Sequence, residues 1–425
     1  MSEETVALVL AGGHVGGYGV LTHNRTKGAL PFAGHYRIID FVMSNLSNSG
    51  ILNVGVITQY LPASLIEHIG AGDSWDLHGR DRMVKIMPPF VGVKQTTWFR
   101  GTSDAILRNL SLVEDLDPEN VMIMSGEHIY RMNYEKAIEQ HRENNADLTI
   151  IGKKLPREEL STRYGFIKTD ENGKVSSFKE KPKDFLSDFI SIGIYIFKKD
   201  VLMEEFMKRA ENGPTQNFVY DVIEPICKTR NVFAYEYKGY WEYLRTVNDF
   251  YEVSMSLLED DPVIKPDEWE IVTNLEDRSL GSRNPTVLDK DADVSDSLIS
   301  PGCRIGGAVK GSILSPGVIV EKGATVEDSI IMHDCRIMKG ARIRNVIADK
   351  NVVFEENCKA GGKVREETTN PDLPFSSKGL TVIGKGVLVG KNVEIGGSSQ
   401  VYPDLDLEPY AGTKFAPGVN ITFGA

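Results

Sequence analysis

The stretch VIGKGVLVGKNVEIGGSSQV, residues 382–401, carries an aliphatic side chain at every sixth position. Ile383, Val389, Ile395 and Val401 form this repeat, and glycines lie between them. A small or aliphatic residue with a six-residue period is typical of a left-handed parallel β-helix, in which each short strand stacks on the next. Irregular β-hairpins would instead show two-residue turns and strict alternation, which this region mostly lacks. The stretch therefore predicts a β-helix.

The six-residue period continues toward the amino terminus as far as about Asp289. Further pairs with this spacing are Cys303 and Val309, Val318 and Ala324, Val320 and Val326, Cys335 and Ala341, and Ile337 and Ile343. We expect a β-helix domain over residues 289–425, with a polar loop insert near 360–379. The preceding residues 261–288 are rich in acidic residues, proline and turn formers, which predicts a linker.

The first part of the chain, residues 1–260, alternates apolar runs with helical patterns. The apolar runs are TVALVLAG (5–12), GILNVGVITQY (50–60), ENVMIMSGEHIY (119–130) and ADLTIIGKKL (146–155). Helical segments such as NYEKAIEQHRENN (133–145) lie between them. This order predicts an α/β, Rossmann-like domain with a mostly parallel sheet, whose ligands bind at the carboxyl ends of the strands.

Composition limits the possible partners and location. The chain has 425 residues, of which 25% are charged, and a formal net charge of -12. Such a charge argues against nucleic acid as the main partner, although a few local cations can still hold an anionic substrate. The amino-terminal residues have no basic region before their short apolar run, and no apolar stretch reaches membrane-spanning length. We expect a cytoplasmic protein without membrane contact.

A glycine-rich loop follows the first apolar run, in ALVLAGGHVGGYGVLTHNRTKGALPFAG, residues 7–34. Backbone amides in such a loop can come close to a nucleotide phosphate. The loop carries Gly16, Gly17 and Gly19 but no lysine or arginine before Arg25. Glycine also serves ordinary tight turns, so the loop alone leaves nucleotide binding and a plain turn about equally open.

The order of several motifs indicates a family. LVLAGG, LTHNRTKGALPFAGHYRIIDFVMSNLSNSGI, VITQY, WFRGTSDAI, SGEHIYRMNY, YGFI, FKEKP and SIGIYIF follow one another along the chain. With the six-residue repeats, they make nearly the whole chain resemble the ADP-glucose pyrophosphorylases, also called glucose-1-phosphate adenylyltransferases. The resemblance implies a nucleotidyltransferase domain before the β-helix, and a reaction that joins ATP and glucose 1-phosphate into ADP-glucose and pyrophosphate for glycogen synthesis. It also implies a tetramer and a small-molecule allosteric effector.

The resemblance assigns two groups of binding residues. The nucleotide-binding positions are Leu10, Ala11, Gly12, Gly13, Gln59, Gly101 and Thr102. The positions for the sugar phosphate are Arg100, Gly165, Glu180, Lys181, Ser191 and Tyr195. Within the second group, Lys181 corresponds to the cation that holds the phosphate of glucose 1-phosphate.

Other positions depart from the family pattern. Gly17 stands where the family has the arginine that grips the triphosphate, whereas Lys27 matches the family's lysine. Glu127 replaces the aspartate that holds Mg²⁺, and Tyr243 replaces the second metal-binding aspartate. The remaining catalytic candidates are therefore Lys27 and Glu127, with Glu127 as a weak metal ligand, because its longer side chain moves the carboxylate outward.

These departures leave two main hypotheses. In the first, the chain is a regulatory or weakly catalytic subunit that needs no cofactor, binds glucose 1-phosphate or ADP-glucose, and forms a homotetramer or a heterotetramer with an active homologue. In the second, it is an active adenylyltransferase that uses Mg²⁺ at Glu127, with Lys27, Arg100 and Arg25 in place of the missing arginine. A weaker third hypothesis is a sugar nucleotidyltransferase that uses another nucleotide. We favour the first, because one missing charge contact in such a site costs about 3 kcal/mol and several are missing here.

Overall fold

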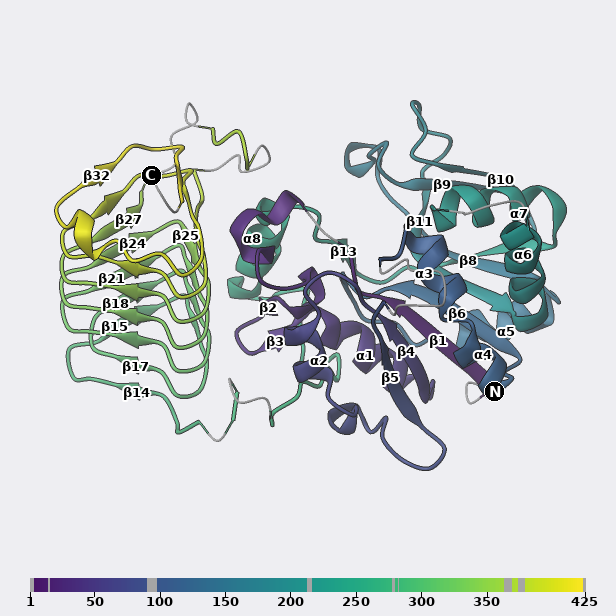
Figure 1. Cartoon of the computed structure of the whole chain (residues 1–425), viewed down its shortest axis with the longest axis horizontal. Coiled ribbons are helices and arrows are strands. Elements are labelled where there is room, and N and C mark those ends of the chain that lie inside the picture. Colours follow the sequence, from purple (N-terminus) through teal and green to yellow (C-terminus); the bar gives the residue numbers. More distant parts are fainter. Residues whose placement is uncertain are drawn as a thin grey trace. The chain divides into compact units, whose positions relative to one another are not determined.

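The computed structural model describes residues 4–13, 16–89, 98–211, 216–276, 280–281, 283–362, 369–373 and 379–422 (Figure 1). The chain divides into two compact units. Unit 1 comprises Met1–Gly13, Phe41–Pro62 and Ile69–Glu242, and unit 2 comprises His14–Asp40, Ala63–His68 and Tyr243–Ala425. The boundaries expected from the sequence, 1–260, 261–288 and 289–425, stay a prediction.

Unit 1 contains a nine-stranded mixed sheet with the order β10-β9-β11-β6-β1-β4-β5, in which β8 pairs with β11 and β12. Its strands are β1 (Thr5–Leu10), β4 (Asn53–Ile57), β5 (Met83–Met87), β6 (Asn120–Ser125), β8 (Leu148–Lys154), β9 (Gly165–Thr169), β10 (Val175–Glu180), β11 (Phe189–Lys198) and β12 (Val232–Glu236). β1 pairs in parallel with β4 and β6, and β11 runs antiparallel to β6 and β8. The α/β class expected from the sequence is confirmed, and the sheet is mixed because β11 joins its neighbours by antiparallel pairing.

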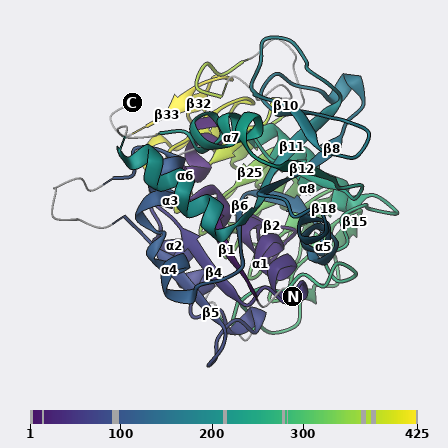
Figure 2. The same ribbon diagram turned by 90° about the vertical axis from the view of Figure 1, so that its right-hand side faces the viewer.

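Burial explains why these segments form strands. β1 is buried almost throughout, as expected of a central strand with parallel neighbours and covered faces. The helices that begin and end in unit 1 are α3 (Thr102–Arg108), α4 (Ser111–Leu116), α5 (Glu135–Glu143), α6 (Lys199–Glu211) and α7 (Glu224–Thr229), with a π-helix at Val219–Ile223. Helices α5 and α6 pack against the sheet (Figure 2). The glycine loop starts at the carboxyl end of β1, the end at which ligands of such sheets bind.

The remaining helices and strands complete the first part of the chain. They are helices α1 (Ile38–Asn48), α2 (Ala63–Ile69) and α8 (Val247–Met255), strands β2 (Pro31–Phe32), β3 (Tyr36–Arg37), β7 (His128–Tyr130) and β13 (Trp241–Tyr243), and 3₁₀ helices at Gly16–Thr22, Lys27–Ala29, Asp73–Trp75, Arg157–Glu159 and Ser256–Leu258. Among the described residues, none of the helices has the length and apolar character needed to cross a bilayer.

Most of unit 2 is a β-helix built from three parallel sheets. The first contains β14 (Val287–Leu288), β17 (Arg304–Ile305), β20 (Ile319–Val320), β23 (Arg336–Ile337), β26 (Val353–Phe354) and β29 (Leu388–Val389). The second contains β15 (Asp293–Ser295), β18 (Ala308–Lys310), β21 (Thr325–Glu327), β24 (Arg342–Arg344), β27 (Lys359–Gly361), β30 (Glu394–Ile395) and β32 (Lys414–Phe415). The third contains β16 (Leu298–Ile299), β19 (Ile313–Leu314), β22 (Ile330–Ile331), β25 (Val346–Ala348), β28 (Thr381–Ile383), β31 (Gln400–Val401) and β33 (Asn420–Ile421).

Stacked apolar side chains form the interior of this β-helix. In the first sheet, the strands from β17 to β29 each supply one buried residue that pairs in register with the next: Ile305, Val320, Ile337, Phe354 and Val389. The corners use residues that tolerate a left-handed backbone, mainly Gly, Asn and Asp. The predicted hexapeptide β-helix is confirmed. The insert expected near 360–379 falls between β27 and β28, and its residues 363–368 and 374–378 lie outside the described residues.

Candidate functional site

The glycine loop begins at the carboxyl end of β1. The backbone N–H of Ala11 donates to the carbonyl of Ile57 at 2.9 Å, and the carbonyl of Gly12 accepts from Tyr60 N–H at 3.2 Å. A Cβ on Gly12 would lie 2.4 Å from the backbone nitrogen of Gln59, so only glycine fits there. The structure thus brings the predicted positions at residues 10–13 next to Gln59.

Gln59 connects this loop to the segment that contains Gly101 and Thr102. Its side-chain oxygen accepts a hydrogen bond from Phe99 N–H at 2.6 Å, and its amide donates to the Phe99 carbonyl at 3.4 Å. Thr102 begins α3, and Arg100 lies exposed shortly before it. Nucleotide binding by these residues stays a prediction.

The predicted sugar-phosphate positions Gly165, Glu180 and Lys181 meet through β9 and β10. Gly165 pairs with Glu180, and a Cβ on Gly165 would lie 2.8 Å from a carboxylate oxygen of Glu180. The Lys181 ammonium lies 3.3 Å from the Glu180 carboxylate, and the Lys181 side chain is 51% exposed. Burial raises the pKa of the Glu180 carboxyl, and the charge of Lys181 opposes this effect without cancelling it.

Ser191 and Tyr195 lie on β11 beside a register shift. The Ser191 hydroxyl donates to the Tyr195 hydroxyl oxygen at 3.2 Å and accepts from Gly193 N–H at 3.2 Å. Burial raises the pKa of the Tyr195 phenol, and the charge of Glu180 raises it further. Tyr195 is therefore a neutral hydroxyl close enough to Glu180 to sense its charge. The structure thus brings Ser191 and Tyr195 to the same polar group as Glu180.

The second half of the glycine loop packs against a later segment of unit 2. A Cβ on Gly17 would lie 2.8 Å from the carbonyl oxygen of Arg245. The Lys27 side chain is fully buried. Its ammonium lies 4.6 Å from the ring centroid of Tyr243 and 5.6 Å from that of Tyr18. The catalytic candidate Lys27 thus has aromatic rings beside its charged end.

Comparisons with known proteins decide the family. Residues 6–260 match the family model described as nucleotidyl transferase, and residues 286–383 match the one described as GlmU-like, C-terminal hexapeptide. The glucose-1-phosphate adenylyltransferase of Lachnospira eligens is 41% identical over 423 residues, 98% of this chain and 98% of the relative. This chain belongs to the glucose-1-phosphate adenylyltransferase family.

Two other relatives carry the same name. The glucose-1-phosphate adenylyltransferase of Acetivibrio thermocellus is 36% identical over 428 residues, 99% of this chain and 96% of the relative. That of Clostridium perfringens (strain SM101 / Type A) is 42% identical over 327 residues, 75% of this chain and 81% of the relative. Membership of the adenylyltransferase family therefore covers nearly the whole chain, including the β-helix.

The residues present do not fit the magnesium site that the sequence motifs imply for this adenylyltransferase family. Mg²⁺ prefers oxygen ligands in octahedral geometry. Glu127 is buried between β6 and β7 in unit 1, while position 243 presents a ring with the Lys27 ammonium over its face. A second cation placed there would be repelled by the ammonium. Among the described residues, no group of three or more His, Cys, Asp or Glu side chains could hold a metal ion. The roles of Glu127 and Lys27 stay predictions.

Arg25, considered from the sequence as a stand-in for the adenylyltransferase loop arginine, has another role. It is buried and forms an ion pair with Asp349, which is also buried and lies in the β-helix part of unit 2. The pair joins residues 324 positions apart, so no local pattern reveals it. Arg25 therefore stabilises the fold of unit 2 through this buried ion pair. The hypothesis that it replaces the missing arginine loses support.

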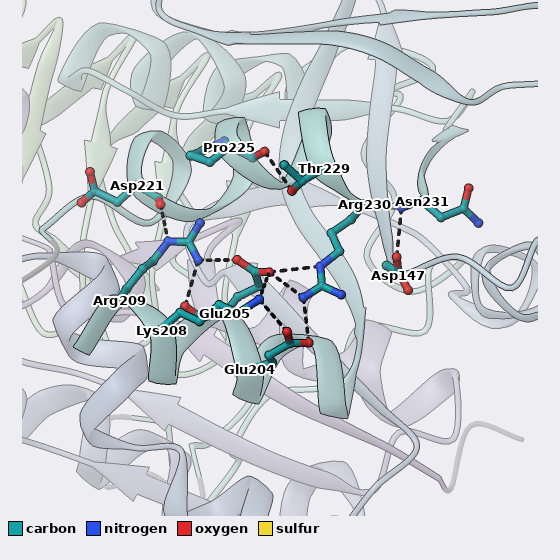
Figure 3. A network of polar contacts seen from close by, with 10 residues as sticks. All are labelled: Asp147, Glu204, Glu205, Lys208, Arg209, Asp221, Pro225, Thr229, Arg230 and Asn231. Atoms are coloured by element: carbon teal, nitrogen blue, oxygen red, sulfur yellow. Dashed lines mark hydrogen bonds and ion pairs between the residues drawn. The ribbon is translucent and has the colours of Figure 1, made fainter. Parts of the chain in front are cut away.

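A second charged cluster, which no sequence motif indicates, joins α6 to Arg230, the residue just after α7 (Figure 3). The Glu205 carboxylate accepts from the guanidinium groups of Arg209 and Arg230, at 2.5 and 2.8 Å. Arg209 also donates to the Asp221 carbonyl at 2.6 Å, and Arg230 pairs with Glu204 at 2.7 Å. Of the contacts just named, the pairing of Glu205 with Arg209 is visible in the sequence as an i,i+4 spacing, whereas those of Arg230 are not. Since its charges pair with one another, we interpret this cluster as structural.

Proposed function

We propose that this chain binds the substrates of the reaction that names its family, ATP and glucose 1-phosphate, and catalyses ADP-glucose formation only weakly on its own. We further propose that it modulates an active homologue within a tetramer, in response to a small-molecule effector. One observation supports the proposal of weak catalysis: the Lys27 ammonium is buried beside the rings of Tyr18 and Tyr243.

The chemistry of the reaction explains why this burial matters. Attack of the sugar phosphate on the α-phosphorus of ATP places negative charge on the departing pyrophosphate, which cations must stabilise. Gly17 supplies no charge, and a fully buried Lys27 is screened from a ligand in solution. The absence of one such contact costs about 3 kcal/mol, roughly a hundredfold in rate. Two such losses make slow turnover the expected result.

Binding of the sugar phosphate has separate support. Lys181 is half-exposed beside a largely buried Glu180, so its ammonium can reach a phosphate while the carboxylate orients it. The hydroxyls of Tyr195 and Ser191 are neutral but buried, so their contribution to sugar binding stays a prediction of the sequence motifs. The charges of Lys181 and Glu180 suit glucose 1-phosphate or the glucose phosphate part of ADP-glucose.

The second candidate is a fully active adenylyltransferase. The comparisons favour this candidate over a regulatory subunit, because the relatives from Lachnospira, Acetivibrio and Clostridium are all named for the enzyme. Exposed Arg100 is a cation that could then contact the triphosphate. This candidate requires magnesium, for which the sequence motifs offer only the carboxylate of Glu127, and that single carboxylate weighs against it.

Turnover of the purified chain decides between the two candidates. The assay supplies ATP, glucose 1-phosphate and Mg²⁺, with sugar-phosphate effectors varied, and UTP, CTP and GTP replace ATP in parallel. We expect turnover well below about one per second for the chain alone. Turnover of a few per second, within the ordinary enzyme range, would overturn weak catalysis.

Assembly is tested on the same preparation. Adding a homologue that keeps the loop arginine and both aspartates should change the effector response of that homologue and give mixed tetramers. Light scattering that finds only monomers, with or without the homologue, would overturn the tetramer. An unchanged effector response in a mixed tetramer would overturn the modulating role.

A further inference from the structure

We propose that Tyr243 is a positioning residue for Lys27: together with Tyr18 it forms an aromatic box that holds the Lys27 ammonium inside unit 2. The inference rests on the proposed function only in taking Lys27 as the lysine of the transfer reaction. The ammonium lies 4.6 Å from the Tyr243 ring centroid and 5.6 Å from that of Tyr18. Within about 6 Å, the negative face of an aromatic ring attracts a cation.

Burial gives this attraction its weight. Lys27 and Tyr18 are both fully buried, and Tyr243 is partly buried. A buried ammonium loses its hydration, which is costly unless other groups compensate for it. A cation–π contact contributes about twice as much or more when it is desolvated as it does at an exposed site. The two rings therefore help to make a fully buried lysine tolerable at this position.

The surrounding structure fixes the walls of the box. The Tyr18 hydroxyl donates to the carbonyl of Leu244, the residue after Tyr243, at 2.9 Å. The Tyr18 ring also packs edge-on against Phe250 of α8, with ring centroids 6.2 Å apart. Helix α8 starts at a capping box made by Thr246 and Asp249, and this anchors the segment that carries Tyr243.

Gly17 belongs to the same arrangement. An added Cβ there would lie 2.8 Å from the Arg245 carbonyl oxygen and 3.5 Å from the Thr246 Cα. The arginine that the family has at position 17 would therefore force the loop away from the segment that carries Tyr243. Gly17 precedes Tyr18 and packs against Arg245, two residues after Tyr243, so the replacements at positions 17 and 243 lie on the same two packed segments.

Amine labelling tests the box directly. The folded chain is treated with limiting acetic anhydride, and the labelling rates of Lys27 and Lys181 are compared by peptide mass spectrometry. Lys181 is half-exposed and serves as the standard within each sample. We expect Lys27 to react at least about tenfold more slowly than Lys181 in the natural chain and in Tyr243→Phe, which keeps the ring. In Tyr243→Leu, which removes the ring but stays apolar, Lys27 labelling should rise about tenfold.

The comparison of Phe with Leu separates a cation–π role from simple packing. Equal Lys27 labelling in Tyr243→Phe and Tyr243→Leu would overturn the box. If Tyr243→Leu fails to fold, phenylalanines with increasing fluorination at position 243 keep the shape and weaken the ring's negative face. Labelling should then rise stepwise with fluorination, and a flat series would overturn the box.

The labelling experiment needs no substrate, so its outcome is independent of the turnover assay that tests the proposed function. Fast turnover of the natural chain together with protected Lys27 would overturn weak catalysis and leave the box intact. Slow turnover together with readily labelled Lys27 would overturn the box and leave weak catalysis intact.

Discussion

Glu180 at the end of β10 and Glu205 within α6 are two largely buried glutamates of unit 1 whose pKa values move in opposite directions. Burial raises the pKa of Glu180, and its neighbour Lys181 only partly opposes the rise. Burial also acts on Glu205, but the hydrogen bonds and charges of Arg209 and Arg230 outweigh it, so the Glu205 pKa lies below its ordinary value. The folded protein therefore stabilises the Glu205 carboxylate and disfavours that of Glu180.

The difference separates a structural cluster from a candidate binding site. The Glu205 charge is neutralised by partners on α6 and just after α7, and this pairing ties the two helices together (Figure 3). The Glu180 charge has a half-exposed cation as its partner, which can turn toward a ligand. A charge held at a cost to stability is typical of sites selected for function. Three substitutions, at Glu205, Lys181 and Glu180, test this contrast, and a fourth, at Gly17, tests the packing of the glycine loop in unit 2.

Glu205→Gln should cause the largest change, a loss of local stability around α6 and α7. Removing this carboxylate leaves the largely buried guanidinium of Arg209 without its ion pair, so we expect a loss of about 3 kcal/mol in local stability at pH 7. Hydrogen exchange of the α6 and α7 peptides measures it, with Glu204→Gln, at a more exposed carboxylate, as the matched control.

The pH dependence of Glu205→Gln follows from the same pairing. Because the folded pKa of Glu205 is lowered, its stabilising effect is present above the ordinary glutamate pKa and is lost as the pH falls through the lowered value. The gap in stability between the variant and the natural chain should therefore narrow in acid. A gap that widened in acid would contradict the structural interpretation.

Lys181→Met should weaken binding of glucose 1-phosphate by roughly 30-fold, about 2 kcal/mol, because a charged hydrogen bond to phosphate is lost. Isothermal titration calorimetry measures the affinity. Lys183→Met, two residues along the same exposed loop, removes an equal charge and should leave the affinity within about twofold. Equal losses in both variants would show that the phosphate senses only the general charge of the loop.

Gly17→Ala should destabilise unit 2 by about 1.5 kcal/mol, since the added Cβ meets the Arg245 carbonyl oxygen. Gly16→Ala is the matched control, because a Cβ at Gly16 has nothing within 4 Å. Hydrogen exchange of the peptides that contain the start of α8 distinguishes the two. If Gly17→Ala and Gly16→Ala give the same hydrogen exchange at the start of α8, the loop does not pack against this segment as described.

Glu180→Gln should have the smallest effect on local stability. It should stabilise its surroundings slightly, whereas Glu205→Gln destabilises them. The raised folded pKa means that the Glu180 charge costs stability above that pKa, and the cost disappears as the pH falls to the ordinary glutamate value. We expect the variant to gain less than about 1 kcal/mol at pH 7 in the β9 and β10 peptides, measured by hydrogen exchange, while glucose 1-phosphate binding weakens. As the control, Glu171→Gln at an exposed position should change neither the local stability nor the affinity for glucose 1-phosphate. A clear loss of stability in Glu180→Gln would place Glu180 among the structural charges.

The sequence predicts best what depends on nearby residues. The β-helix follows from a six-residue period that each strand repeats, so the stacking of Ile337 on Val320 needs no distant information. Gly165 and Glu180 also meet through two strands that are neighbours in the chain, β9 and β10. Family motifs therefore locate the sugar-phosphate group closely enough for its binding role to be tested.

Contacts between distant segments were not predictable in the same way. From the sequence, Arg25 is a candidate cation for a phosphate, yet Asp349 pairs with it from 324 positions away. Lys27 matches an intact catalytic lysine, yet its surroundings depend on Tyr243, whose replacement of an aspartate appears in the sequence only as a loss. The physical reason is that burial and charge pairing arise from tertiary packing, which a local pattern does not encode.

The composition of unit 2 also has a consequence for the order in which the protein is made. Its first segment, His14–Asp40, leaves the ribosome long before the segment Tyr243–Ala425 that completes the unit. At about 5–20 residues per second, Asp349 is synthesised roughly 16–65 s after Arg25. During that interval both Arg25 and Lys27 can remain hydrated, because Asp349 is not yet translated and Tyr243 emerges only part-way through it. Unit 2 therefore closes only near the end of translation, when the β-helix recruits a segment that emerged at its beginning.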